Sequence, residues 1–142
     1  MLPLRSTFLT LASVVALAIG SIAVGLPHVL LAGKGVALPN LAAAVWVREV
    51  GVSIFAQGVT MFLVRKHADS PTLRAFFCGS AIVQVGLLGI ELAAYRERVI
   101  PLLSGILPNS VLHVVLASGF LAYAARMRGA VAAHEAFTQP EV

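Results

Sequence analysis

Charged residues are scarce in this sequence. Lys, Arg, Asp and Glu make up 11% of its 142 residues and hydrophobic residues 59%, whereas an ordinary soluble domain carries about 25% charged residues. The mean hydropathy is +0.95. This composition excludes an ordinary soluble domain and predicts an all-α integral membrane protein.

Cysteine is almost absent as well, and several functional motifs are missing. The single cysteine, Cys78, excludes an intramolecular disulfide and a CxxC redox or zinc motif. The sequence contains no glycine-rich phosphate loop, nucleophile motif or redox-cofactor signature. We therefore expect no cofactor and no metal. The net charge of +4 comes mainly from Lys and Arg at the ends of apolar segments, where they anchor helices, so we expect no nucleic-acid partner.

Four apolar segments are long enough to cross the ~30 Å hydrocarbon core of a bilayer as helices. They cover residues 7–26, 41–64, 75–95 and 102–125. Pro27 ends the first segment, and Asn40 is a good cap for the second. The sequence thus predicts a four-helix transmembrane domain over residues 1–128, followed by a polar tail over residues 129–142.

The distribution of basic residues predicts the orientation. With four spans, the two ends of the chain and the second loop share one side, which holds Arg5, Arg65, Lys66, Arg74, Arg126 and Arg128; the other side holds Lys34, Arg96 and Arg98. The positive-inside rule then places both termini in the cytoplasm and the protein in the inner membrane. Cleavage of the first segment as a signal peptide stays an alternative, although its apolar run is longer than usual.

The first loop, "PHVLLAGKGVALPN", is long and apolar for a segment outside the bilayer. It is either an interfacial segment lying in the headgroups or a lid over a pocket. Gly33 and Gly35 would be the flexible point of such a lid.

An arginine and a glutamate stand side by side inside the second span, as Arg48 and Glu49 in "WVREV". At ~1.5 Å per residue they lie about 12 Å from the start of this span. A charge near the bilayer centre costs ~2.5 to 3.5 kcal/mol, so each side chain is expected to meet a partner or a cavity. Neighbours on a helix point in different directions, so each partner should come from another span.

Polar residues also follow one face of each of three spans. The three lines are Glu49, Ser53, Gln57 and Thr60; Ser80, Gln84 and Glu91; and Asn109 and His113. We expect them to converge in a pocket that opens outward beneath the first loop. The predicted site has Glu49, Glu91 and His113 as its acid–base groups, with Arg48, Gln84, Asn109 and Trp46 binding the ligand.

Two glutamates beside one arginine can be held in different protonation states, which supplies a general acid and a general base. The leading hypothesis is a pocket for an isoprenoid, quinone or sterol-like molecule, with isomerisation, cyclisation or epoxide opening as candidate reactions. The alternatives are a non-catalytic membrane subunit and a small transporter. In the subunit, Arg48 would pair with Glu91 or Glu49, or Glu91 with Arg96, for structure alone. A transporter would require a dimer, so a homo-oligomer or a membrane partner protein also fits the sequence.

The second span resembles a known pattern. "WVREVGVSIFAQGV", with Arg48, Glu49, Gly51 and Gly58, is similar to the second helix of small bacterial DoxX-like membrane proteins. The loop "DSPTLR" and a histidine in the fourth span, His113, fit the same group. The resemblance implies a four-helix membrane fold, and it implies little about activity because the group is functionally diverse.

Overall fold

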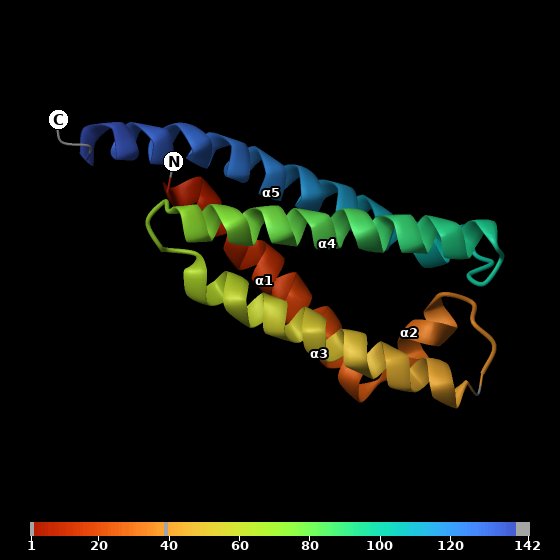
Figure 1. The fold of residues 1–142 in the computed structure, drawn as a ribbon. Coiled ribbons are helices and arrows are strands. Elements are labelled where there is room, and N and C mark those ends of the chain that lie inside the picture. The colour runs from red at the N-terminus through yellow and green to blue at the C-terminus, as the bar shows by residue number, and fades with distance from the viewer. Residues whose placement is uncertain (1, 39, 139–142) are drawn as a thin grey trace.

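The computed structural model describes residues 2–38 and 40–138, which form helices and no strands. Figure 1 shows the arrangement of the five helices. They are α1 (Leu2–Gly25), α2 (Pro27–Gly33), α3 (Leu41–Val64), α4 (Pro71–Arg96) and α5 (Leu103–Thr138). All except the short α2 are long and apolar enough to cross a membrane. The all-helical fold with four candidate spans is therefore confirmed.

The observed helices agree closely with the predicted spans. The bounds of α3 coincide with the prediction, and the Asn40 side chain caps it by accepting a hydrogen bond from the Ala43 N–H at 3.0 Å. Ser70 caps α4 in the same way, accepting from the Leu73 N–H at 3.1 Å, so this helix starts four residues earlier than predicted. The α5 helix continues to Thr138, past the predicted limit of the span at residue 125 and into the predicted tail.

The long helices form two pairs. In Figure 1, α1 crosses α3 and α4 runs beside α5, and these two pairs make most of the contacts between helices. The first pair is held by small residues, since a Cβ on Gly20 would lie 2.8 Å from the Phe55 nitrogen and one on Gly51 would lie 2.7 Å from the Ala23 Cβ. Such close backbone approach is typical of membrane helices that pack without a hydrophobic driving force.

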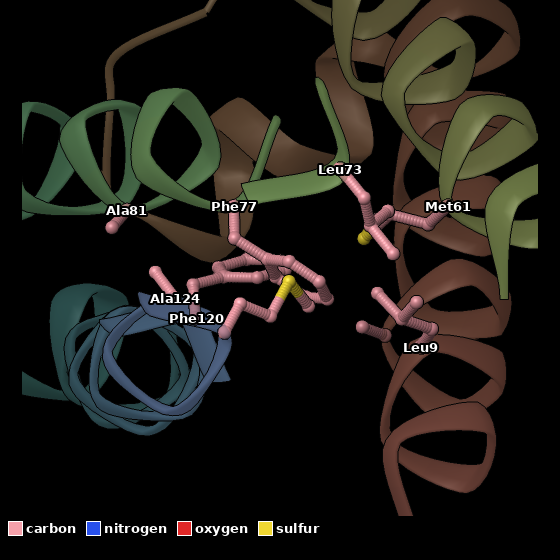
Figure 2. Close-up of a cluster of buried hydrophobic side chains, with 9 residues drawn as sticks. Leu9, Met61, Leu73, Phe77, Ala81, Phe120 and Ala124 are labelled. Carbon is pink, nitrogen blue, oxygen red and sulfur yellow. The ribbon is translucent and has the colours of Figure 1, made fainter. Parts of the chain in front are cut away.

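The two pairs meet in one apolar cluster, shown in Figure 2. Phe77 of α4 and Phe120 of α5 are fully buried there, together with Leu9 of α1 and Met61 of α3. The Phe8 ring stands edge-on to Phe120, with centroids 5.3 Å apart. Aromatic rings supply large contact areas. This cluster therefore ties all four long helices together at the end of the bundle where α1 begins.

A buried arginine holds the same end of the bundle. Arg5 of α1 is 3% exposed and forms an ion pair with Asp69, and it also donates to the carbonyl of His67. It thereby fastens the start of α1 to the loop between α3 and α4. In Figure 1, α5 ends on this side too, as an even number of spans requires. Which side of a membrane this end occupies stays a prediction.

Candidate functional site

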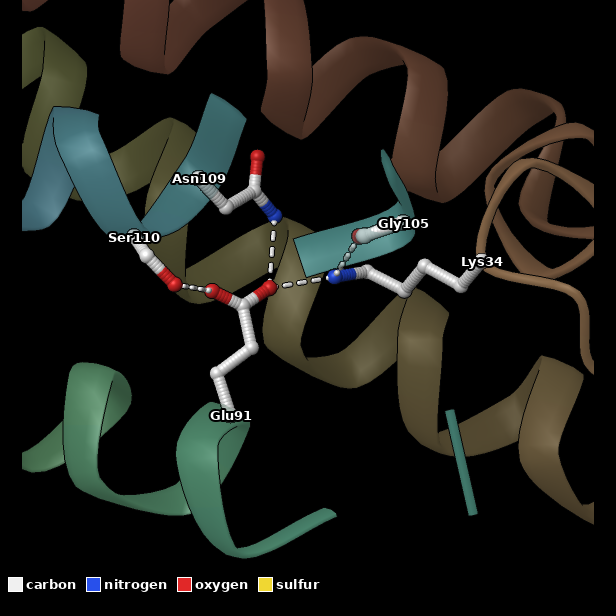
Figure 3. A network of polar contacts seen from close by, with 5 residues as sticks. All are labelled: Lys34, Glu91, Gly105, Asn109 and Ser110. Atoms are coloured by element: carbon white, nitrogen blue, oxygen red, sulfur yellow. Dashed lines mark hydrogen bonds and ion pairs between the residues drawn. The ribbon is translucent and has the colours of Figure 1, made fainter. Parts of the chain in front are cut away.

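A polar cluster lies at the other end of the bundle, around Glu91 of α4 (Figure 3). Glu91 is 7% exposed, and its Oε1 accepts hydrogen bonds from Lys34 and, at 3.1 Å, from the Asn109 amide of α5. Its Oε2 accepts from the Ser110 hydroxyl at 3.2 Å. Buried charges need such partners because desolvation is costly. The cluster is therefore a satisfied ionic site built from α4, α5 and the segment that follows α2.

Lys34 reaches Glu91 because two glycines let its chain segment lie against α5. A Cβ on Gly105 would be 2.9 Å from the Lys34 Cα, so only glycine fits there without a shift. Gly35 has φ +76°, a left-handed conformation that favours glycine, and it packs against Leu102. The Lys34 Nζ also donates to the Gly105 carbonyl at 3.3 Å. The predicted apolar loop thus folds as α2 plus a glycine turn that delivers a lysine to the cluster.

A second polar pair lies deeper along the same two helices. The Nδ1 of His113 on α5 is 2.7 Å from Oε1 of Gln84 on α4, and Gln84 is 7% exposed. Because a carbonyl oxygen only accepts, Nδ1 carries the proton in this arrangement and Nε2 is left as an acceptor. Counted from the end of α4 at ~1.5 Å per residue, Glu91 lies about 8 Å deep and Gln84 about 18 Å deep. The two polar groups therefore occupy successive depths on one face.

The structure brings together four of the predicted site residues. Glu91, Gln84, Asn109 and His113 line the α4–α5 interface, as their polar lines suggested. The partner of Glu91 differs from the predictions, which considered Arg48 and Arg96. It is Lys34.

The other three predicted residues lie elsewhere, so the three polar lines do not converge. Trp46 is 66% exposed, and Arg48 and Glu49 are also on the exposed surface of α3. Arg48 donates through Nε to the Val24 carbonyl of α1 at 3.3 Å. The reason is that α3 packs on α1 through the face that carries Gly51 and Gly58. Glu49 points almost directly away from that face.

Sequence reasoning missed Lys34 and Ser110. Lys34 had a usable signal, since it is the one charged residue of the apolar first loop and Glu91 needed a cation at that side of the membrane. Ser110 had none, because a lone serine beside an asparagine is common on helices. Among the described residues, no group of three or more His, Cys, Asp or Glu side chains could hold a metal ion.

A surface hollow of about 530 Å³ lies near the end of α4, lined by Leu92, Ala93, Arg96 and Glu97. These residues are largely exposed and follow a different face of the helix from Glu91. The hollow therefore does not contain the polar cluster, and we base no function on it.

No protein-family model, curated protein or solved structure matches this chain. The fold and the cluster define it as an all-helical, membrane-type protein with a buried ionic site between two helices. The DoxX-like resemblance stays a prediction. Any functional proposal consequently rests on the chain's own residues.

Proposed function

We propose that the protein binds a lipophilic small molecule that carries a polar group, such as an isoprenoid, a quinone or a sterol-like compound, at the α4–α5 polar face. The observation that supports this most is the stacking of two polar groups at successive depths, Lys34–Glu91 above Gln84–His113. A purely apolar interface would hold two helices together equally well. Ionisable groups inside a span are costly and mark ligand or proton paths by default.

The chemistry available at this face is acid–base chemistry. His113, oriented by Gln84, offers Nε2 to accept a proton, and the Lys34 ammonium offers positive charge to a developing anion. Glu91 holds Lys34 in place and can itself exchange a proton when the lysine moves aside. Isomerisation, cyclisation or epoxide opening of the bound molecule would use these groups, with Glu49 no longer among them.

Lys34 is well placed to control access. It comes from the loop after α2 rather than from a long helix, and its side chain is 25% exposed while that of Glu91 is 8% exposed. Movement of this segment would not require any of the four long helices to break. We propose that it acts as a lid whose lysine is exchanged for the polar group of the ligand.

Binding at this site should raise thermal stability, and the site variants should abolish the effect. A ligand at 100 times its Kd stabilises the folded state by about 2.7 kcal/mol. We expect members of a panel of isoprenoid alcohols, quinones and sterols to raise the melting temperature of the purified wild type. Glu91→Gln and His113→Leu should lose the response, and Glu97→Gln, an exposed carboxylate at the end of α4, should keep it. A response that survives in Glu91→Gln would refute the assignment of the site.

A structural role is the second candidate, and one observation favours it. Both oxygens of the Glu91 carboxylate already have protein donors. If the role of the cluster is structural, it fastens the α2 segment to α4 and α5, and the protein is a non-catalytic subunit. The two candidates differ in ligand response, since only the first predicts one.

We also infer that the protein lies in the inner membrane with both termini in the cytoplasm. The support is the excess of Lys and Arg at the end of the bundle where α1 begins, six against three. Under this orientation the Glu91 cluster faces the outer leaflet. Labelling of single cysteines near either terminus with a membrane-impermeant reagent tests the orientation directly.

A further inference from the structure

The Arg48 and Glu49 charges on α3 are left unexplained by the α4–α5 site. Glu49 is exposed on the face of α3 turned away from α1, and within the part of the chain that the structure describes its carboxylate accepts no side-chain hydrogen bond. It lies about 12 Å along the span, at ~1.5 Å per residue. A single copy of the protein would expose this carboxylate to lipid, at a cost of ~2.5 to 3.5 kcal/mol.

The residues around Glu49 form a regular seam along α3. Spacings of four and three alternate over the exposed positions Val45, Glu49, Val52, Ala56, Val59 and Leu63. This is the 3.5-residue period by which two helices supercoil with side chains interlocked. Valines occupy one position of each repeat, and the other holds Glu49, Ala56 and Leu63. Within residues 2–38 and 40–138, no helix covers this seam, because α3 packs mainly on α1 through its opposite side.

We propose that the seam is the dimer interface with a second copy of this chain, in which Arg48 of each copy pairs with Glu49 of the other. Two copies inserted with the same topology place α3 beside α3 in parallel, so residues 48 and 49 of both lie at the same depth. In a parallel pair of helices with interlocked side chains, the Glu49 side chain of one copy packs beside residues 48 and 49 of the other. It therefore lies next to Arg48 of the other copy.

Charge complementarity favours a second copy of this chain over a different protein as the partner that covers the seam. The seam is self-complementary, since it offers one cation and one anion at one depth, and a two-fold axis pairs both. Arg48 lies at the edge of the seam nearest α1, where its Nε donates to the Val24 carbonyl at 3.3 Å. In the proposed dimer, its two Nη nitrogens would donate to Glu49 of the second copy. The proposal is independent of the α4–α5 site and survives if that site binds no ligand.

Disulfide trapping tests the geometry of the seam. In a Cys78→Ala background, Val52→Cys lies in the seam. Val50→Cys is the matched control on the other side of α3, only about 3 Å away along the helix axis. Both positions are exposed, at 59% and 46%. In vesicles with a large excess of lipid, we expect oxidation to trap dimers of Val52→Cys and not of Val50→Cys. Equal trapping of both, or of neither, would overturn the proposal.

A charge swap tests the ion pairs themselves. Arg48→Glu and Glu49→Arg, each alone, should weaken dimerisation by about tenfold, the loss of ~1 to 2 kcal/mol of interhelical polar contact. The double variant Arg48→Glu/Glu49→Arg should restore it, measured as the dimer fraction by single-molecule photobleaching in vesicles. If the double variant remains monomeric although it is folded by circular dichroism, the charges do not pair across a dimer.

Discussion

Replacing Lys34 with methionine is expected to destabilise the protein by about 3 kcal/mol. The substitution keeps most of the apolar stem and removes the ammonium that pairs with Glu91, which is 7% exposed. Breaking a buried ion pair on one side costs ~3 to 5 kcal/mol, because the remaining charge is left uncompensated. The lower end applies here, since the Lys34 side chain is 25% exposed. Unfolding by SDS in mixed micelles measures the change.

A second variant distinguishes the loss of the Lys34–Glu91 attraction from the cost of leaving the Glu91 carboxylate buried without a cation. The double variant Lys34→Met/Glu91→Leu should recover most of the stability, because apolar replacements of a buried pair are often neutral or stabilising. Lys66→Met is the control, since Lys66 is exposed in the turn that follows α3 and its replacement should change stability by less than about 0.5 kcal/mol. If Lys34→Met behaves like Lys66→Met, Lys34 does not reach Glu91 in the membrane.

Replacing Gly51 with leucine is expected to be the most damaging substitution in α3, with a loss of about 3 kcal/mol. Even a single Cβ at this position would lie 2.7 Å from the Ala23 Cβ and 3.1 Å from the Val24 nitrogen. Backbone atoms cannot move aside as a flexible side chain can, so α1 and α3 must separate. Overpacking of this kind costs ~1 to 3 kcal/mol and occasionally more.

Gly86→Leu on α4 is the matched control. A Cβ there meets nothing within 4 Å. Leucine is a better helix former than glycine by roughly 0.8 kcal/mol, so this variant should be neutral or slightly more stable. Equal destabilisation by the two substitutions would mean that the α1–α3 contact is looser than the structure shows.

The helices themselves were predictable from sequence because their causes are local. Hydropathy over about 20 residues fixes each span, and Pro27 and Asn40 mark boundaries by their own chemistry. The face of α4 that carries Ser80, Gln84 and Glu91 followed from spacing alone, and all three are buried. The short α2 and the full length of α5 were not anticipated.

The partners of the charges were not predictable in the same way. Spacing shows that Glu49 and Ser53 share a face of α3, but it does not say which helix, if any, covers that face. The glycines that bring α1 onto the opposite face decide this, and their effect depends on the packing of both helices. The contact between Lys34 and Glu91 depends similarly on how the first loop packs against Gly105. These are tertiary contacts between segments far apart in sequence, and the helical period of one segment does not predict them.

The ligand site between α4 and α5 is tested most directly by native mass spectrometry with extraction of bound lipids, on wild type, Glu91→Gln and Glu49→Gln. We expect a specific isoprenoid, quinone or sterol-like mass in the wild type and in Glu49→Gln, and its loss from Glu91→Gln. Bulk phospholipid alone in all three proteins, or retention of a specific ligand in Glu91→Gln, would contradict a ligand site between α4 and α5.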